Sequence, residues 1–534
     1  MSGGRESDDV KKRTQRFFGV TGEIAVSTVL CTVALILIGL LISAMVATTT
    51  ISITDQGLET LSFLSDQPIV SLLLLVVGLL ALLLTERLIR RIPYSRLGAL
   101  AFFLVLISGT VFVLSARSFP THDSFQVTQA GVAMRYGDAS PLSTKYFIHY
   151  PFQLGYVLWT ELLSYPLVHG GNYLPLQIPN VICLAVASFA LVQIARLLFH
   201  SPRTSRLLVL LILLFPQGIW FCTFLYGNVP AYCFAMLGVW MLLRYFERER
   251  WRDLLLCALF LLIAVWLKLN SLIVFVACVI CLLVHLWQKR RIKLLPGFLI
   301  LLLCVPLMKD LPVRLYEART DIEFGTGIPM AAWASMGLHT ASGNRPGWYN
   351  GNITVGVYEQ YGRDAEKTIE HSMANIKKRL EHFASEPADA VDFFGRKVLS
   401  QWNEPTFQSI WNVQVRGSYG KRVGIAKAVC DEAPDFFAAL CDLMHGVNLL
   451  GAAVGTIALL RRRRAGDMLL PLIFLGGFLY HLIFEAKSQY VLIYMMTLLP
   501  IAAYGYRVFF SRLRRLAQGV AGHLCSRSKE ASHE

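Results

Sequence analysis

Charged side chains are scarce in this chain of 534 residues. Asp, Glu, Lys and Arg make up 16% of it, whereas hydrophobic residues make up 55%. Because soluble domains carry about 25% charged residues, this composition excludes a soluble enzyme and indicates a protein that crosses a membrane several times. The net charge of +15 does not indicate a nucleic acid partner, since the basic residues cluster at the ends of apolar runs, where they suit cytoplasmic loops and anionic membrane lipids.

Other features are missing as well. The chain has no internal repeat, no low-complexity segment and no soluble nucleotide-binding domain, and its basic loops are short, so a nucleotide-sugar donor bound in the cytoplasm is not favoured. No convincing cleavage site follows the first apolar run, 24–47, which therefore reads as an uncleaved span. Cys278 and Cys281 have CxxC spacing but no polar neighbours, so we predict no metal or redox site there.

Long apolar runs are abundant, and we predict about twelve membrane-spanning helices in an all-α polytopic membrane protein. The predicted spans are residues 24–47, 68–85, 98–116, 175–199, 206–226, 229–246, 254–269, 271–287, 293–311, 437–460, 467–484 and 490–510.

Every second loop between these spans is basic, including the four-arginine run at 461–464. Basic loops stay in the cytoplasm, so both termini are predicted to be cytoplasmic in a multi-pass protein of the cell membrane. Residues 150–168 are apolar, but a span there would place the four-arginine run outside. We therefore predict an interfacial or re-entrant helix at 150–168, which makes the loops 117–174 and 312–436 extracytoplasmic.

The region 312–436 is polar enough to form a helical insertion on the outer side. Apolar residues recur with helical spacing over 364–385, and a second helix is predicted over 388–401, between two prolines. The resulting division of the chain is a tail (1–23), two N-terminal spans (24–97), a membrane core (98–311), the outer helical region (312–436), C-terminal spans (437–510) and a basic tail (511–534).

Asp123 is the leading candidate for chemistry, because it lies just beyond a predicted outer membrane exit in a chain poor in charge. Carboxylates in such positions are functional candidates by default. Two other roles are open. Asp123 could cap a helix that starts near Phe125, or it could bind a divalent metal together with His122 and His149; no fourth ligand stands at a recognisable spacing, so we predict no metal centre.

Asp123 is also part of a set of five segments that occur in order and on one predicted side of the membrane. They are PTHD at 120–123, YF at 146–147 with YPFQLG at 150–155, YGNVP at 226–230, KLN at 268–270, and EAKSQY at 485–490.

Together, over about residues 98–510, these segments resemble the GT-C glycosyltransferases that use polyprenyl-phosphate sugars, such as protein O-mannosyltransferases and lipid A aminoarabinose transferases. The resemblance implies a GT-C-like membrane core and leaves the two N-terminal spans as an addition to it. The chain departs from the family at Ser124, where a second acid is common, and at Gln489, where an arginine often precedes the tyrosine. The base role therefore falls to Asp123 alone.

Transfer of a sugar from a lipid phosphate requires a base for the acceptor hydroxyl and cations for the leaving phosphate. Asp123 is the candidate base, and Lys268, Arg345 and Lys487 are the candidate phosphate ligands. Lys268 could instead extend to the interface, and Lys487 could form a structural ion pair with Glu485. Further substrate-binding candidates are His122, Tyr150, Asn270, Trp348, Glu485 and Tyr490, although Trp348 and Tyr349 could also anchor their loop in the interface.

The preferred function is inverting transfer of a sugar from a polyprenyl-phosphate donor to a glycan, lipid or protein acceptor at the extracytoplasmic face, among membrane lipids and without a required cofactor. A transporter or flippase of lipid-linked sugars is one alternative, although no related halves are visible. A polysaccharide polymerase or ligase is the other.

One covalent feature is also predicted. Cys430 and Cys441 both fall near the outer face, where an oxidising environment favours a disulfide, and Pro434 between them could help the chain turn back. Two free thiols are the alternative, with Cys441 already within the next span.

Overall fold

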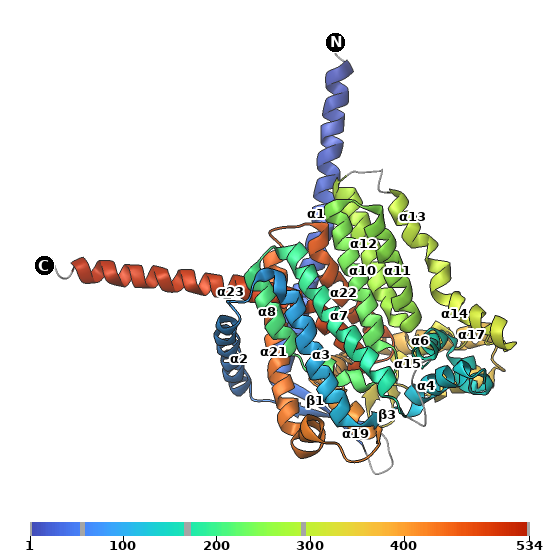
Figure 1. Ribbon diagram of the computed structural model, residues 1–534. Helices are drawn as coiled ribbons and strands as arrows, with labels where there is room; N and C mark the ends of the chain where they lie inside the picture. The colour runs from blue at the N-terminus through green and yellow to red at the C-terminus, as the bar shows by residue number, and fades with distance from the viewer. Residues whose placement is uncertain (1–2, 54–58, 165–171, 290–294, 531–534) are drawn as a thin grey trace.

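The computed structural model describes residues 3–53, 59–164, 172–289 and 295–530, and almost all of its regular elements are helices (Figure 1). The expected all-α polytopic membrane protein is confirmed. The long helices pack side by side in one bundle. They are α1 (Gly3–Val46), α2 (Pro68–Leu88), α3 (Leu97–Ala116), α7 (Leu174–Phe199), α8 (Pro202–Leu213), α10 (Asn228–Arg248), α11 (Trp251–Leu267), α12 (Leu272–Lys289), α21 (Pro434–Leu459), α22 (Ala465–Ile483) and α23 (Ser488–Glu530).

Most of the shorter elements lie around one end of this bundle, whereas α13 (Leu295–Leu303) lies along its side, next to α11 and α12 (Figure 1). The other helices are α4 (His122–Arg135), α5 (Lys145–His149), α6 (Leu154–Ser164), α9 (Gln217–Trp220), α14 (Val305–Thr320), α15 (Met330–Gly337), α16 (Val357–Gln360), α17 (Ala365–Ser385), α18 (Pro387–Trp402), α19 (Ser409–Val415) and α20 (Gly424–Lys427). Three two-stranded pairs join them: β1 (Ala47–Ile53) with β2 (Glu59–Ser65), β3 (Ser118–Phe119) with β6 (Gly417–Ser418), and β4 (Thr340–Ala341) with β5 (Arg345–Pro346).

The number of spans differs from the prediction. Among the described residues, nine helices are long and apolar enough to cross a membrane, or ten if α8 and residues 217–223 form one span bent by 50°, so the count of twelve is not confirmed. The predicted span 254–269 corresponds to α11, whose 17 residues are at the lower limit for a crossing. The predicted span 293–311 begins outside the described residues and is divided between α13 and α14, and α14 includes the charged residues Asp310 and Arg314.

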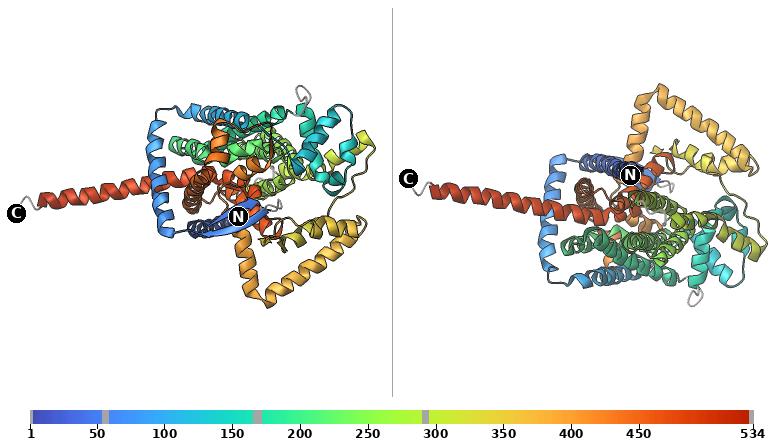
Figure 2. Two further views of the ribbon diagram at one scale, coloured as in Figure 1. Left: turned by 90° about the horizontal axis from the view of Figure 1, so that it is seen from below. Right: turned by 90° about the horizontal axis from the view of Figure 1, so that it is seen from above.

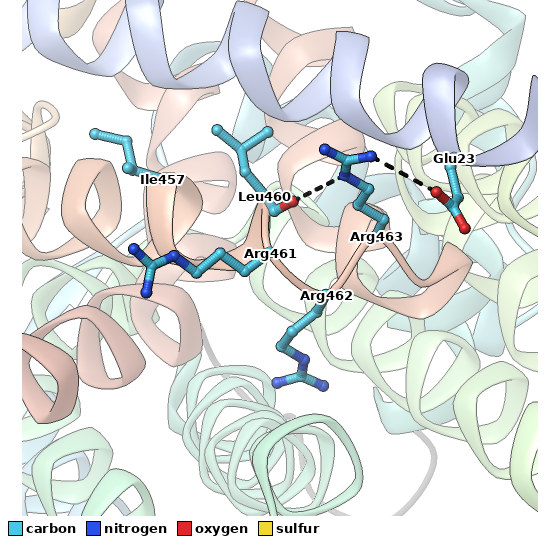
Figure 3. A pocket seen from close by; sticks show the side chains of 6 residues that line it. All are labelled: Glu23, Ile457, Leu460, Arg461, Arg462 and Arg463. Atoms are coloured by element: carbon cyan, nitrogen blue, oxygen red, sulfur yellow. Dashed lines mark hydrogen bonds and ion pairs between the residues drawn. The ribbon is translucent and has the colours of Figure 1, made fainter. Parts of the chain in front are cut away.

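The basic turns gather at one end of the bundle. Glu23 of α1 lies 3.6 Å from Arg463 in the turn between α21 and α22 (Figure 3). The Gln288 amide at the end of α12 donates to the Arg463 carbonyl at 3.1 Å, and Arg464 donates to the carbonyl of Leu198 at the end of α7 at 3.0 Å. The turns that the charge pattern assigned to one side therefore lie together.

An open cavity of about 640 Å³ lies at this end. The cavity adjoins the last turn of α21, whose 26 residues make a helix about 39 Å long. The residues that are candidates for chemistry lie at the other end of the bundle, so the cavity is distant from them. Figure 3 shows the side chains that line it: Glu23, Ile457, Leu460, Arg461, Arg462 and Arg463.

Asp123, Lys268 and Glu485 lie at the opposite end. Each follows a helix that starts at a basic turn, namely α3, α11 and α22. In Figure 1 the start of α1 is at the top, whereas β3, α4 and α19 are at the bottom. These three residues therefore share one end of the bundle.

The segment 150–168 forms no span in its described part. It begins with a short 3-10 turn and continues as α6, which has 11 residues and is too short to cross a membrane. Residues 165–168 lie outside the described residues. α6 packs against α4, the helix that carries Asp123.

The two helices predicted in the region 312–436 are confirmed as α17 and α18. The carboxylate of Asp364 accepts the Lys367 backbone N–H at 3.1 Å and caps α17. Pro387 is the first residue of α18, where a missing N–H costs nothing. Figure 2 shows the two helices as the sides of a V that projects from the bundle.

The predicted disulfide between Cys430 and Cys441 is wrong, since both thiols are free and buried. Pro434 does not turn the chain back but begins the long helix α21. Cys441 is therefore carried two turns along a helix into the neighbourhood of Glu404, whereas Cys430 stays beside Arg422 and Asp431.

Candidate active site

Asp123 lies in the first turn of α4, directly after β3, and its side chain is exposed. The helix begins at His122 with Thr121 as its N-cap, three residues before the start that the capping alternative requires, so Asp123 is not the cap. His122 is also exposed and has a φ of 50°, an unfavourable conformation for a residue other than glycine that recurs at functional sites.

A chain of side-chain contacts leads from Asp123 to Glu485. The Tyr226 hydroxyl lies 3.4 Å from Asp123 Oδ2, and the Lys268 ammonium lies 3.9 Å from the Tyr226 ring centre. The same ammonium is 5.9 Å from the ring of Tyr490, whose hydroxyl is 3.4 Å from Glu485 Oε1. We call these five residues the Asp123 cluster. It contains two carboxylates and a lysine held between two aromatic rings.

Two glycines allow these segments to meet. A Cβ on Gly155 would lie 2.1 Å from the carbonyl oxygen of Trp266, and a Cβ on Gly227 would lie 2.2 Å from that of Leu267. Gly227 also has a φ of 83°, which favours glycine. The YPFQLG and YGNVP segments therefore contact the end of α11 directly, and this contact places Lys268 over Tyr226.

The structure brings Arg416, which the sequence analysis missed, into this group. Its guanidinium donates to the Ser124 hydroxyl at 2.5 Å and to the Asn412 amide oxygen at 2.8 Å. It also lies 4.0 Å from the ring centre of Phe224. Because Ser124 follows Asp123 in α4, a second cation stands beside the candidate base. Nothing near position 416 in the sequence signals this role.

Lys397 of α18 holds the segment that carries Glu485 and Lys487. Its side chain is fully buried. The Lys397 ammonium donates to the carbonyls of Leu482 at 2.9 Å and Phe484 at 2.8 Å, and to that of Gly337. A cation at the end of a helix satisfies carbonyls that have no partner within the helix. Lys397 therefore fixes the end of α22, from which Glu485 continues.

Glu404 fixes the other side of this segment. Its carboxylate accepts the Ser488 hydroxyl at 2.7 Å and the backbone N–H of Gln408 at 2.6 Å, and it also binds Thr406. Ser488 is the first residue of α23. Two buried, hydrogen-bonded side chains, Lys397 and Glu404, thus hold the segment that contains Glu485 and Lys487.

Arg345 and Lys487, the other predicted phosphate ligands, lie next to each other. The Lys487 ammonium is 3.0 Å and the Arg345 guanidinium 3.4 Å from the carboxylate of Glu59 in β2. Trp348 packs beneath both cations, 5.2 and 5.7 Å from them. It has no exposed surface, and its indole N–H faces Ser400 at 3.3 Å. Its ring lies against the two cations, whereas the neighbouring Tyr349 is exposed. The contact of Trp348 with substrate stays a prediction.

The remaining predicted residues lie near the Asp123 cluster. The Tyr150 hydroxyl is 3.1 Å from that of Tyr349, and Asn270 is half-buried in the turn after Lys268. His149 does not face Asp123, because its Nε2 is 2.7 Å from Glu359 Oε1. Over the described ranges, no three His, Cys, Asp or Glu side chains are grouped as metal ligands.

Burial sets the ionisation of three groups at this end. It lowers the pKa of Lys268 to about 8, against the opposing charges of Glu485 and Asp123. It raises the pKa of Glu485 to about 7, against the neighbouring cations Lys487 and Lys268. It lowers the pKa of Arg416 to about 9, against Asp123. Loss of solvation thus dominates the nearby opposite charges in each case.

One comparison matches part of this chain to a known family. Residues 156–308 match the family described as dolichyl-phosphate-mannose-protein mannosyltransferase. The match includes Tyr226, Lys268 and Asn270 but not Asp123 or Glu485. It confirms the predicted resemblance to GT-C glycosyltransferases and supports, in general terms, an enzyme that uses a lipid-phosphate sugar.

A solved structure is also similar, namely the archaeal oligosaccharyltransferase AglB from Archaeoglobus fulgidus in complex with an inhibitory peptide and a dolichol-phosphate. The identity is 13% and the TM-score 0.36, over 78% of this chain. The alignment spans 52% of that protein, so this chain matches about half of its length. No curated protein matches the sequence.

Proposed function

We propose that this protein transfers a sugar from a polyprenyl-phosphate donor to an acceptor hydroxyl at the extracytoplasmic face, with inversion at the anomeric carbon. The observation that carries the proposal is the Asp123 cluster. It presents an exposed carboxylate and a half-buried ammonium on either side of Tyr226, at the end of the bundle opposite the basic turns.

The chemistry divides between these groups. Asp123 accepts the proton of the acceptor hydroxyl. The acceptor oxygen then bonds to the anomeric carbon as the bond from that carbon to the phosphate oxygen breaks. Lys268, Lys487 and Arg345 balance the charge on the departing lipid phosphate. Attack opposite the leaving group inverts the anomeric configuration.

The position of these groups relative to the membrane is a prediction of its own. Basic turns stay in the cytoplasm, and they lie together at the end of the bundle remote from Asp123. Ser140 and Lys421 are exposed at the Asp123 end, whereas Arg461 is exposed at the basic end.

We therefore expect Ser140→Cys and Lys421→Cys to react with an impermeant maleimide in intact cells, and Arg461→Cys to react only after permeabilisation. The unsubstituted protein is the control for background labelling. The opposite pattern would place the site in the cytoplasm and overturn the proposed acceptor side.

The function itself is tested with the purified protein in lipid nanodiscs and a panel of polyprenyl-phosphate sugars. We expect release of the lipid phosphate with at least one donor, dependent on an added acceptor. Absence of release with every donor and acceptor would overturn the proposal and favour a transporter of lipid-linked sugars.

A further inference from the structure

The two N-terminal spans look like an addition to the catalytic core in the sequence, and they lie outside the family match at 156–308. In the structure, the β1–β2 hairpin between them reaches the candidate site. The Thr49 backbone N–H donates to the Asn403 carbonyl, and the Asn403 amide donates to the Ala47 carbonyl, both at 2.9 Å. Ile51 and Leu61 pack against the buried group formed by Ala341, Trp348 and Ala486.

This docking brings Glu59, the first residue of β2, between two cations from distant parts of the chain. Its carboxylate contacts the Lys487 ammonium at 3.0 Å and the Arg345 guanidinium at 3.4 Å. All three side chains are largely buried, with exposed fractions of 15%, 15% and 11% for Glu59, Lys487 and Arg345. Ion pairs with this little exposure are screened far less than surface pairs.

The two cations differ in how else they are held. The Arg345 Nε–H donates to the Ser342 carbonyl at 2.7 Å, so the backbone fixes one edge of the guanidinium. Lys487 has a flexible four-carbon stem, and among the described residues its ammonium makes hydrogen bonds and ion pairs with Glu59 only. Without that carboxylate, the nearest acid for Lys487 is Glu485, two residues away.

We propose that Glu59 is a positioning residue of the donor site: it holds Lys487 beside Arg345, so that both cations face the lipid phosphate. This inference rests on the proposed function. Two cations and one carboxylate leave one net positive charge, which matches the single negative charge of a phosphodiester. Holding the side chains in place before binding reduces the entropy lost when the phosphate binds.

The test measures phosphate-lipid binding without turnover. The probe is the methyl ester of decaprenyl phosphate, a phosphodiester with the single negative charge of the donor, titrated into protein in nanodiscs of neutral phosphatidylcholine. We expect Glu59→Gln to weaken binding about tenfold, because Lys487 is then no longer held beside Arg345 before the phosphate binds. Glu59→Asp keeps the charge but is shorter, and an intermediate loss is expected. Glu432→Gln is the matched control, since Glu432 pairs with Lys427 on an exposed surface.

Kinetics separate positioning from a general structural role. With a donor that the parent accepts, Glu59→Gln should raise the donor KM by a similar factor, and kcat should fall as well, because Lys487 also balances the charge on the departing phosphate. A loss of kcat at unchanged KM would show damage to the site as a whole and contradict the proposal.

Equal or tighter binding by Glu59→Gln would also overturn it, and tighter binding would mean that Glu59 competes with the phosphate. If Glu59→Gln does not fold, Glu59→Asp is tested in its place. Binding of the probe by Glu59→Asp as tightly as by the parent would then contradict the positioning role of Glu59. A parent that binds the phosphodiester probe but transfers no sugar would contradict the proposed function and leave the role of Glu59 measurable.

Discussion

Replacement of Asp123 by Asn should reduce sugar transfer by about two to four orders of magnitude, the usual cost of losing one general base. Asn keeps the shape of the side chain but cannot accept the proton. The rate is measured as release of lipid phosphate with a donor that the parent accepts, per folded molecule.

Stability should change little in the same variant. Asp123 is exposed in the first turn of α4 and is not its N-cap. The change removes a favourable interaction with the helix dipole, worth about 0.3–1 kcal/mol at such positions, and the attraction of Asp123 to Lys268 and Arg416. Asp138→Asn is the matched control, because Asp138 is an exposed carboxylate nearby that binds the Ser140 N–H.

Transfer at near the parent rate by Asp123→Asn would show that the base lies elsewhere. Glu485 would then be the first acid to test, since it stands at the other end of the Asp123 cluster. A large loss of thermal stability in Asp123→Asn, with activity retained per folded molecule, would instead indicate a structural role.

Replacement of Lys268 by Gln should reduce kcat/KM about 10²- to 10³-fold, the cost of losing one group that stabilises developing charge. The Lys268 ammonium lies over the ring of Tyr226, whose hydroxyl contacts the candidate base. Little change in Lys268→Gln would favour the alternative in which Lys268 only extends to the membrane interface.

The pH dependence of kcat/KM gives a second test, because it reports the free enzyme. Burial lowers the pKa of Lys268 to about 8, so the protonated fraction falls as the pH rises through 8, and the parent rate should fall with it. Lys268→Arg keeps its charge in this range and should extend activity to higher pH. An unchanged alkaline limb in Lys268→Arg would show that another group sets it.

Much of the site was visible as separate sequence segments. The five segments from PTHD to EAKSQY do converge at one end of the bundle, and their glycines explain how closely they approach. None of these segments indicated which side chains pair with one another. Arg416 reaches Ser124 from 292 residues away, and Lys487 reaches Glu59 from 428 residues away.

The tertiary structure also decided which side chains are buried. The sequence allowed Trp348 either to bind substrate or to anchor its loop in the interface, whereas in the structure Ile51 and Leu61 of the N-terminal hairpin pack against the buried group that contains it. The predicted disulfide between Cys430 and Cys441 is wrong for a similar reason. The two residues are close in sequence, but α21 begins between them, and their side chains have different neighbours.

The sequence by itself determined the membrane class, the helices at 364–385 and 388–401, and the separation of basic turns from the candidate acids. The membrane class follows from composition, and the helices and basic turns follow from sequence patterns that extend over a few turns of chain. Only the tertiary structure decided that an N-terminal hairpin joins the site, that Lys397 and Glu404 hold the segment between α22 and α23, and that Arg416 stands beside Asp123. Such contacts form when distant segments pack and their buried charged groups need hydrogen-bond or ion-pair partners. No local sequence pattern predicts them.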